Sequence, residues 1–327
     1  MRILKSKKIT IFTLVIVFLM VLAACDTQTD GDASDYPRQP VTLMIPYGAG
    51  GTTDMFFRHF ADIAEEHLGQ NIIIENETGG GGLSMYSTLA NADPDGYTLS
   101  GCCGNTLYGI VPHLDLMDHD GDDFTHIRPV MGYQHVVMAS ADAPFQTFKE
   151  LIEYSKDNSI DFATPSPNNH IYAELINQEE DFELQWNVAN YNDDGEILAA
   201  ILGGHVDFTV TSPVSVSGAE EAGDVNILAL INEEGIEDYP EVPTLQDLGY
   251  DLNLSATIGI GGPNDLPDKV VAKWDDVISE TLEDSELKEF AETNGFTIPE
   301  MSPQEAEEHY EELEQQYGEV ADRITGD

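Results

Sequence analysis

The stretch Val41–Asp54 has the sequence VTLMIPYGAGGTTD, and it decides the fold. An apolar, strand-like run ends at Pro46, and three glycines follow within four positions before an amphipathic pattern begins at Met55. This order predicts a strand, a bare loop and the N-terminus of a helix. Glycines let backbone N–H groups approach a ligand, and the unpaired amides at a helix start favour an anion. A plain structural turn, with Thr53 or Asp54 as the helix cap, is the alternative.

The first 25 residues predict export and a lipid anchor. Four basic residues precede an apolar stretch over Ile9–Ala24, which is short for a membrane span and ends in small residues. Cys25 follows where a bacterial lipobox has its acylated cysteine, so residues 1–24 are expected to be a signal peptide, with an incidental cysteine as the alternative. The polar residues 25–39 are expected to form a flexible tether. The domain is then expected to be exported and lipid-anchored to the outer face of the cytoplasmic membrane, in a periplasm or at the cell surface.

The charge of the chain is strongly acidic. It has 13 Lys and Arg against 61 Asp and Glu, a formal net charge of −48. Without residues 1–24, 9 basic residues face 61 acidic ones, which gives −52. Repulsion excludes nucleic acid as a natural partner. The acids are spread along a chain that is still 41% hydrophobic, so we expect a folded, halophilic protein whose self-repulsion is screened in a saline medium.

No catalytic residue, cofactor or metal site is expected. The glycine stretch lacks the lysine and spacing of a nucleotide-binding loop, and the chain has no GxSxG elbow or metalloprotease histidine pair. The acidic segment between His113 and Asp123 lacks the order of a calcium loop. Cys102 and Cys103 are adjacent and have no partners at metal-ligand spacing, so they are expected to be small, semi-buried side chains at a strand end.

Apolar runs alternate with helical patterns, which predicts an α/β fold with largely parallel sheets. The length favours two lobes, residues 40–137 with 253–327 and residues 138–252, joined by crossings near Ala139 and Asn253. The expected strands are Leu43–Pro46, Ile72–Glu75, Thr98–Cys102, Val130–Ala139, Asp161–Ala163, Val206–Val210, Ile227–Ile231 and a returning run over Ala256–Ile260. The expected helices are Thr53–Leu68, Gly82–Asn91, Thr147–Ser155, Asn168–Gln178, Glu196–Leu202, Pro267–Leu282, Ser285–Thr293 and Ser302–Tyr317.

An ordered set of motifs over residues 40–315 resembles the receptors of tripartite tricarboxylate transporters, the Bug-type extracytoplasmic solute receptors. The motifs are Pro46–Asp54 with Arg58, Leu68-Gly69-Gln70, Glu75-Asn76 followed by Gly79–Gly82, Pro94–Leu99, Asp123-Phe124-Thr125, Leu202–Asp207, Pro240–Leu245, Leu248-Gly249-Tyr250, Gly262-Pro263 and Leu266-Pro267. The resemblance implies a type II periplasmic-binding-protein fold, in which two α/β lobes and a hinge close on a small ligand, usually a carboxylate. It also implies delivery of that organic acid to the integral membrane permease subunits of such a transporter. A lipid-anchored hydrolase, or an adhesion or sensor lipoprotein, is the alternative function.

The ligand of such a protein is expected on loops at strand ends and helix starts, and in an interlobe cleft. Four loops supply neutral hydroxyls, amides and N–H groups. Asp54 is expected to be a helix-start cap rather than a direct ligand, and Arg58 an ion-pair anchor on that helix rather than a ligand contact. His170 is expected to be either a cap neighbour or a ligand contact. The candidate ligand-binding residues are Tyr47, Ala49, Gly50, Gly51, Thr52, Asp54, Asn105, Thr106, Ser166, Asn168, Asn169, His170 and Tyr191.

Two departures from the family pattern bear on the ligand. Pro165 and Pro167 replace glycines that the family usually has before the histidine, so two backbone donors are absent or redirected. After Tyr191, the family's lysine and glycines are replaced by the run Asn192–Asp194. The added carboxylates would repel a dianion or hold an amino group. A tricarboxylate, dicarboxylate, amino acid or aromatic acid all fit the sequence.

Overall fold

A computed structural model describes most of the chain from residue 36 onward. The residues from Gln39 form one compact unit, and all elements below belong to it. None of the helices in the described residues has the length and hydropathy needed to span a bilayer. The described residues are 36–104, 117–119, 121–165, 176, 186–231, 235–236, 238–250, 256–299, 301–302, 304–306 and 308–312.

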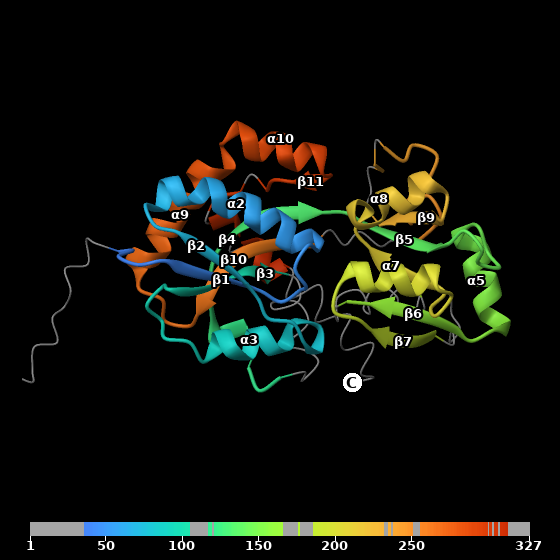
Figure 1. Ribbon diagram of the computed structural model, residues 1–327, viewed down its shortest axis with the longest axis horizontal. Coiled ribbons are helices and arrows are strands. Elements are labelled where there is room, and N and C mark those ends of the chain that lie inside the picture. Colours follow the sequence, from blue (N-terminus) through green and yellow to red (C-terminus); the bar gives the residue numbers. More distant parts are fainter. Residues whose placement is uncertain are drawn as a thin grey trace, which may run out of the picture. The chain divides into compact units, whose positions relative to one another are not determined.

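The first sheet has six strands in the order β11-β4-β10-β3-β1-β2 (Figure 1). Strand β1 pairs in parallel with β2 and β3, whereas β10 runs antiparallel between β3 and β4 and β11 pairs antiparallel with β4. The strands are β1 (Val41–Ile45), β2 (Ile72–Asn76), β3 (Thr98–Gly104), β4 (Phe124–Tyr133), β10 (Ala256–Pro263) and β11 (Phe296–Thr297).

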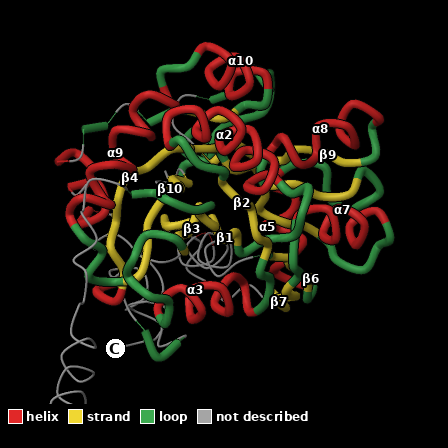
Figure 2. Tube along the Cα trace, turned by 60° about the vertical axis from the view of Figure 1, so that its left-hand side comes forward, coloured by secondary structure: helices red, strands yellow, loops and turns green. Residues whose placement is uncertain are grey.

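Helices cover both faces of this sheet. Figures 1 and 2 show α2, α9 and α10 on one face and α3 on the other. Strand β1 is therefore buried along almost its whole length, as its continuous apolar sequence requires. The helices are α2 (Thr52–Leu68), α3 (Leu83–Ala90), α9 (Asp268–Leu282) and α10 (Ser285–Thr293), with short 3₁₀ turns η2 (Gly80–Gly82) and η4 (Gly121–Asp123).

Helix α2 is fixed by aromatic packing and by its ends. Phe56, Phe57 and Phe60 are completely buried, and the Phe56 ring meets Phe296 of β11 edge to face. The helix stops at Gly69, whose φ of 78° needs a glycine and whose N–H caps the helix. The packing of α2 against the sheet therefore fixes the direction of the N-terminus of this helix.

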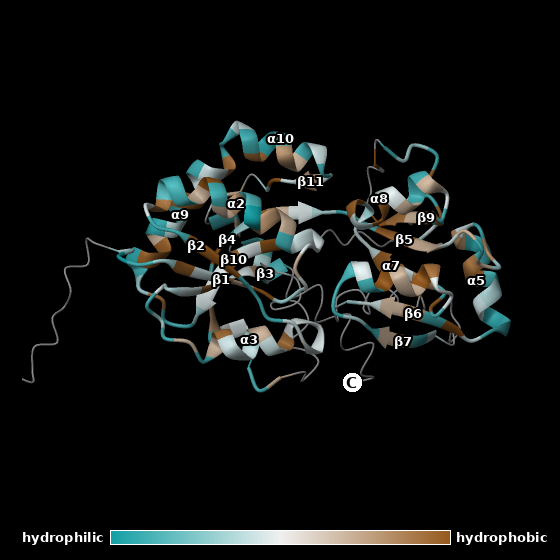
Figure 3. Ribbon diagram, in the orientation of Figure 1, coloured by the Kyte–Doolittle hydropathy of each residue, from teal (hydrophilic) through white to brown (hydrophobic). Residues whose placement is uncertain are grey.

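The second sheet has five strands in the order β7-β6-β8-β5-β9. Strand β6 is parallel to β7 and β8, and β5 is antiparallel to β8 and β9. Figure 3 shows hydrophobic residues along β5 and β9. The strands are β5 (His135–Ser140), β6 (Ile160–Thr164), β7 (Trp186–Asn190), β8 (Phe208–Thr211) and β9 (Val225–Ile231), and the helices are α5 (Phe148–Asp157), α7 (Asp194–Leu202) and α8 (Pro213–Ala222).

One expected strand is wrong, and the error concerns the place where the chain leaves the first sheet. The run Val130–Ala139 is not one strand, because β4 ends at Tyr133 in the first sheet and β5 starts at His135 in the second. The chain thus changes sheet at Gln134, before the residue 137 at which the first lobe was expected to end. It returns to the first sheet at β10. The division into two lobes and the places of its crossings stay predictions.

Other expectations meet a mixed outcome. Trp186–Asn190, Pro213–Ala222 and Phe296–Thr297 were not expected as regular elements. Ser302, at the start of the expected helix Ser302–Tyr317, forms a capping box with Glu305, which accepts from the N–H of Ser302 at 2.7 Å. The expected helix over 168–178 lies outside the described residues, apart from residue 176.

Candidate functional site

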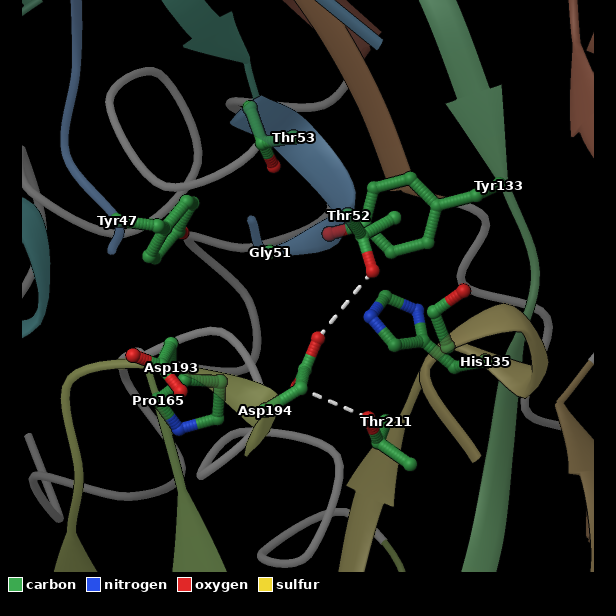
Figure 4. A pocket seen from close by; sticks show the side chains of 11 residues that line it. Tyr47, Gly51, Thr52, Thr53, Tyr133, His135, Pro165, Asp193, Asp194 and Thr211 are labelled. Carbon is green, nitrogen blue, oxygen red and sulfur yellow. Dashed lines mark hydrogen bonds between the residues drawn. The ribbon is translucent and has the colours of Figure 1, made fainter. Parts of the chain in front are cut away.

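A small cavity lies where loops from both sheets meet (Figure 4). Its volume is about 30 Å³. Its wall is built by the β1–α2 loop, the link between β4 and β5, the end of β6, and the starts of α7 and α8. The lining residues are Tyr47, Gly51, Thr52, Thr53, Tyr133, His135, Pro165, Asp193, Asp194, Thr211 and Ser212.

The N-terminus of α2 forms the first wall. Gly51 is the N-cap residue and provides no side-chain cap, so the N–H groups of Thr52, Thr53 and Asp54 have no acceptor within the helix. Thr52 and Thr53 are buried, at 8% and 4% exposure. These amides stand at the positive end of the helix dipole, which favours a carboxylate there.

Asp54 holds this loop in place from behind. Its Oδ2 accepts from the Gly50 N–H at 2.8 Å and from Arg58 Nε at 2.9 Å, while its Oδ1 accepts from Asn76 Nδ2 at 2.9 Å. Asn76 Nδ2 also donates to the Tyr47 carbonyl at 2.9 Å. Burial opposes ionisation of Asp54, but these donors outweigh it and place its pKa below the usual value. Asp54 and Arg58 therefore position the loop.

Asp194 connects the two sheets across the cavity. Its Oδ1 accepts from Thr211 Oγ1 at 2.9 Å, and its Oδ2 accepts from Ser215 Oγ at 2.8 Å and from Thr52 Oγ1 at 3.4 Å. The hydroxyls of Thr52 and Ser215 also lie 2.6 Å apart. Figure 4 shows Asp194 between Thr52 of α2 and Thr211 of β8. Burial raises the pKa of Asp194, and the charge of Asp193 raises it further, although the three hydroxyls act in the opposite direction.

Asp193 is the N-cap of α7 and also reaches the glycine loop. Its Oδ1 accepts from the Glu196 N–H at 2.9 Å, and Glu196 in turn accepts from the Asn192 N–H at 3.1 Å. Its Oδ2 would lie 2.5 Å from a β-carbon added at Gly48. The side chain therefore has one oxygen fixed by the helix and the other turned to the first wall.

The remaining wall combines aromatic rings with one buried hydroxyl. Tyr133 ends β4 and His135 begins β5, and their ring centroids are 5.0 Å apart. Ser212 is the N-cap of α8 and is 2% exposed. Its Oγ has no hydrogen-bond partner among the described residues. Like α2, α8 begins without a side-chain cap.

The structure brings three of the expected ligand-binding residues to the cavity wall, namely Tyr47, Gly51 and Thr52. Ala49 and Gly50 are exposed and Asp54 is enclosed behind the loop. Tyr191 lies outside the wall and packs partly against the core of the second sheet. The others, Asn105, Thr106, Ser166, Asn168, Asn169 and His170, lie outside the described residues, as does Cys25.

Several lining residues were not among the expected ligand contacts. Asp193 and Asp194 were expected as added carboxylates that would repel a dianion or hold an amino group, but they were not among the candidate ligand-binding residues. Thr211 and Ser212 had a sequence signal, because a serine followed by proline directly after an apolar run marks a helix start. Tyr133 and His135 had none, since they fell within one expected strand.

Comparison with known proteins gives a consistent result. The model of the tripartite tricarboxylate transporter family receptor matches residues 56–325. A UPF0065 protein from the gbd 5′ region of Cupriavidus necator is 31% identical over 265 residues, 80% of each chain. The periplasmic binding protein BugD superposes with a TM-score of 0.80 at 24% identity, over 89% of this chain and 99% of that one. MatC from Rhodopseudomonas palustris, solved with bound malate, gives 0.79 at 23% identity, over 88% and 100%.

Proposed function

The chain belongs to the receptor family of tripartite tricarboxylate transporters, and we propose that it captures a small organic acid in the cavity described above. The fold is that of the periplasmic binding proteins, with two α/β sheets. Proteins of this family are solute-binding receptors and not enzymes. The finer parts of the proposal are the class of ligand, the way the site closes, the membrane anchor and the partner permease.

One observation carries the carboxylate assignment. The starts of α2 and α8 both lie on the cavity wall, and neither has a side-chain cap. The α2 start offers consecutive N–H groups to one carboxylate, and both helix dipoles favour a negative charge. A relative of the same fold was solved with malate, which agrees with an acid as the ligand class.

The size of the cavity bears on how the ligand enters. A volume of about 30 Å³ admits two or three water molecules, since one water needs about 10–15 Å³ on this measure. An organic acid needs several times that space. We therefore propose that the two sides of the site separate to admit the ligand, which breaks the Thr52–Asp194 and Thr52–Ser215 contacts, and that they close again on it.

The receptor is proposed to work outside the cytoplasmic membrane. The Cys25 thiol would carry the lipid, and the polar residues 26–39 would let the domain reach a permease of the tripartite tricarboxylate type. The net charge of −52 after processing suits a saline medium.

A ligand screen tests the proposal directly. The mature domain is mixed at high salt with organic acids of one to three carboxyl groups, and with their amino-substituted forms, and the melting temperature is measured. A ligand that binds only the folded state raises the melting temperature by mass action. Calorimetry of each hit should give a single site per chain. Absence of any stabilising compound across the series would contradict a receptor for small organic acids.

A further inference from the structure

We propose that the ligand carries a cationic ammonium group as well as a carboxylate, and that Asp193 and Asp194 hold the ammonium end. The inference rests on the proposed function, because it defines the class of acid that the same cavity receives. The carboxylate end would meet the start of α2, and the ammonium end would meet the start of α7.

The balance of charges is the first argument. The described lining contains two carboxylates and neither lysine nor arginine. The sequence also places no Lys or Arg in residues 105–116 or 166–185, the segments that continue from β3 and β6. A dicarboxylate in this cavity would therefore add two negative charges to two existing ones, whereas a ligand cation would neutralise one of them.

Three basic residues in the described part of the chain are engaged elsewhere. Arg58 is held by Asp54 and Asn76 behind the glycine loop. Arg128 donates to Asp275 and to the Met301 carbonyl. Lys273 of α9 donates to a backbone carbonyl of α2. None of these three side chains pairs with Asp193 or Asp194, which agrees with a cation supplied by the ligand.

The acceptor capacity of the two aspartates is the second argument. A carboxylate offers about four lone-pair sites. Asp194 uses three of them for the hydroxyls of Thr52, Thr211 and Ser215. Asp193 Oδ1 accepts from the Glu196 N–H, and its second oxygen faces Gly48. An ammonium group with up to three N–H donors fits the remaining sites on these two side chains.

Ser212 gives an independent sign that the cavity receives a polar group. Its hydroxyl lines the cavity, is almost fully buried and has no partner among the described residues. A buried hydroxyl without a partner costs free energy, so native structures rarely keep one. A ligand oxygen or N–H group in the cavity would satisfy it.

The aromatic residues suit the same cation. Tyr47, Tyr133 and His135 all line the cavity, and Figure 4 shows the rings of Tyr133 and His135 beside Thr52. A tyrosine face attracts a cation within about 6 Å of its ring centre. A primary ammonium would combine hydrogen bonds to the aspartates with this attraction, and a quaternary ammonium would use charge and the rings alone. Amino acids and betaines share this chemistry.

Matched ligands separate the proposal from a plain carboxylate site. Calorimetry at high salt compares butyrate with 4-aminobutyrate and its N-trimethyl form, and succinate with aspartate. We expect the ammonium-bearing member of each set to bind roughly tenfold tighter or more than its parent acid. Stronger binding of the amino form than of the trimethyl form identifies an amino acid ligand, and the reverse identifies a betaine.

Variants then test which residues are responsible. Asp194→Asn and Asp193→Asn should each reduce the ratio of the affinity for the ammonium ligand to the affinity for its parent acid, whatever their effect on the affinity for the acid itself. Asp276→Asn, on the exposed side of α9, removes the same charge away from the cavity and should leave the preference unchanged. Circular dichroism and melting temperature confirm that each variant is folded.

The outcomes are distinct. Tighter binding of succinate and butyrate than of their ammonium counterparts would overturn the inference and leave the receptor function standing. An ammonium preference that survives in both cavity variants would overturn the assignment to Asp193 and Asp194. Binding of none of these compounds, nor of any acid in the wider screen, would overturn the proposed function and the inference with it.

Discussion

Asp193 and Gly48 approach so closely that a β-carbon at residue 48 would lie 2.5 Å from Asp193 Oδ2. The contact joins the loop after β1 to the start of α7, which belongs to the other sheet. Only glycine at residue 48 permits it without displacing the carboxylate. The contact also sets how near Asp193 comes to the amides of α2.

Replacing Gly48 with alanine should weaken ligand binding. The added methyl group would push the Asp193 carboxylate away from the loop, because a β-carbon at residue 48 would lie 2.5 Å from Asp193 Oδ2. That oxygen is the end of a flexible side chain, so we expect a loss of ligand affinity with little loss of stability. Calorimetry of Gly48→Ala against the best ligand of the screen measures the loss. Gly218→Ala is the matched control, because a β-carbon there meets nothing within 4 Å and residue 218 is inside helix α8. Equal affinity of both variants and the parent would show that the contact is not needed for closure.

Replacing Asp54 with asparagine should reduce stability by about 1–2 kcal/mol, because charged hydrogen bonds to Arg58 and Gly50 are lost. The pKa of Asp54 is lowered in the folded state, so its contribution is present above the pKa of the unfolded chain and is lost as the pH falls through the folded value. Urea unfolding at neutral and acidic pH measures both effects. Asp62→Asn, exposed on the same helix, should change neither. A loss that is the same at all pH values would exclude the charge as its cause.

Binding of an ammonium ligand should strengthen as the pH rises through the pKa of Asp194. That pKa is raised by burial, and the ligand cation pairs with the ionised form, so binding releases a proton in this range. Asp193, His135, Tyr47 and Tyr133 are the other titratable groups on the described wall, and Asp194→Asn isolates the part due to Asp194. Calorimetry in buffers of different ionisation enthalpy counts the protons. Proton uptake instead of release would indicate an anionic ligand end at Asp194.

Replacing Cys25 with serine should free the protein from membranes, because acylation needs the thiol. Fractionation of cells into membrane and supernatant, followed by a ligand-binding assay, checks that the released domain is intact. Cys102→Ala removes a buried thiol in β3 and should leave the protein with the membrane fraction. Unchanged partitioning of Cys25→Ser would contradict the lipobox interpretation.

Added sodium chloride should raise the melting temperature of the mature domain steeply at first and then level off. The net charge of −52 produces self-repulsion that is screened as the Debye length falls from about 10 Å at 0.1 M to about 3 Å at 1 M. Differential scanning calorimetry over a salt series measures this. A melting temperature independent of salt would contradict adaptation to a saline medium.

The sequence predicted the α/β fold and the glycine loop because both depend on local signals. The apolar run ending at Pro46, the glycines and the amphipathic pattern of α2 all lie within one short stretch. The sequence did not predict where the chain passes from the first sheet to the second. Val130–Ala139 is continuously strand-like, and only the pairing partners distinguish β4 from β5. The sequence shows that Asp194 is an added carboxylate in the run after Tyr191. Its contacts with Thr52 and Ser215 could not be predicted, because they join residues far apart in the chain.

Ser212 illustrates a second limit. Its position before Pro213 predicts a helix cap, yet its side chain makes no cap hydrogen bond and lines the cavity instead. Whether a serine caps its own helix or faces a ligand depends on the opposite wall, which a local pattern does not contain. Tyr133 and His135 became neighbours in the site for the same reason.

Because of the Asp54 network, the two ends of the site differ in how well they tolerate substitutions. Asp54, Asn76 and Arg58 hold the glycine loop, which leads into the backbone amides of the first wall. Nearly every substitution of these three residues would therefore disturb the loop. The opposite wall includes the side chains of Asp193 and Asp194 at the start of α7, and neither residue takes part in the Asp54 network. Selectivity should therefore be transferable between receptors by exchanging the residues at the start of α7. Receptors made in this way would bind the carboxylate in the same manner and differ in the group that they recognise at the other end of the site. This makes the protein a suitable starting point for biosensors.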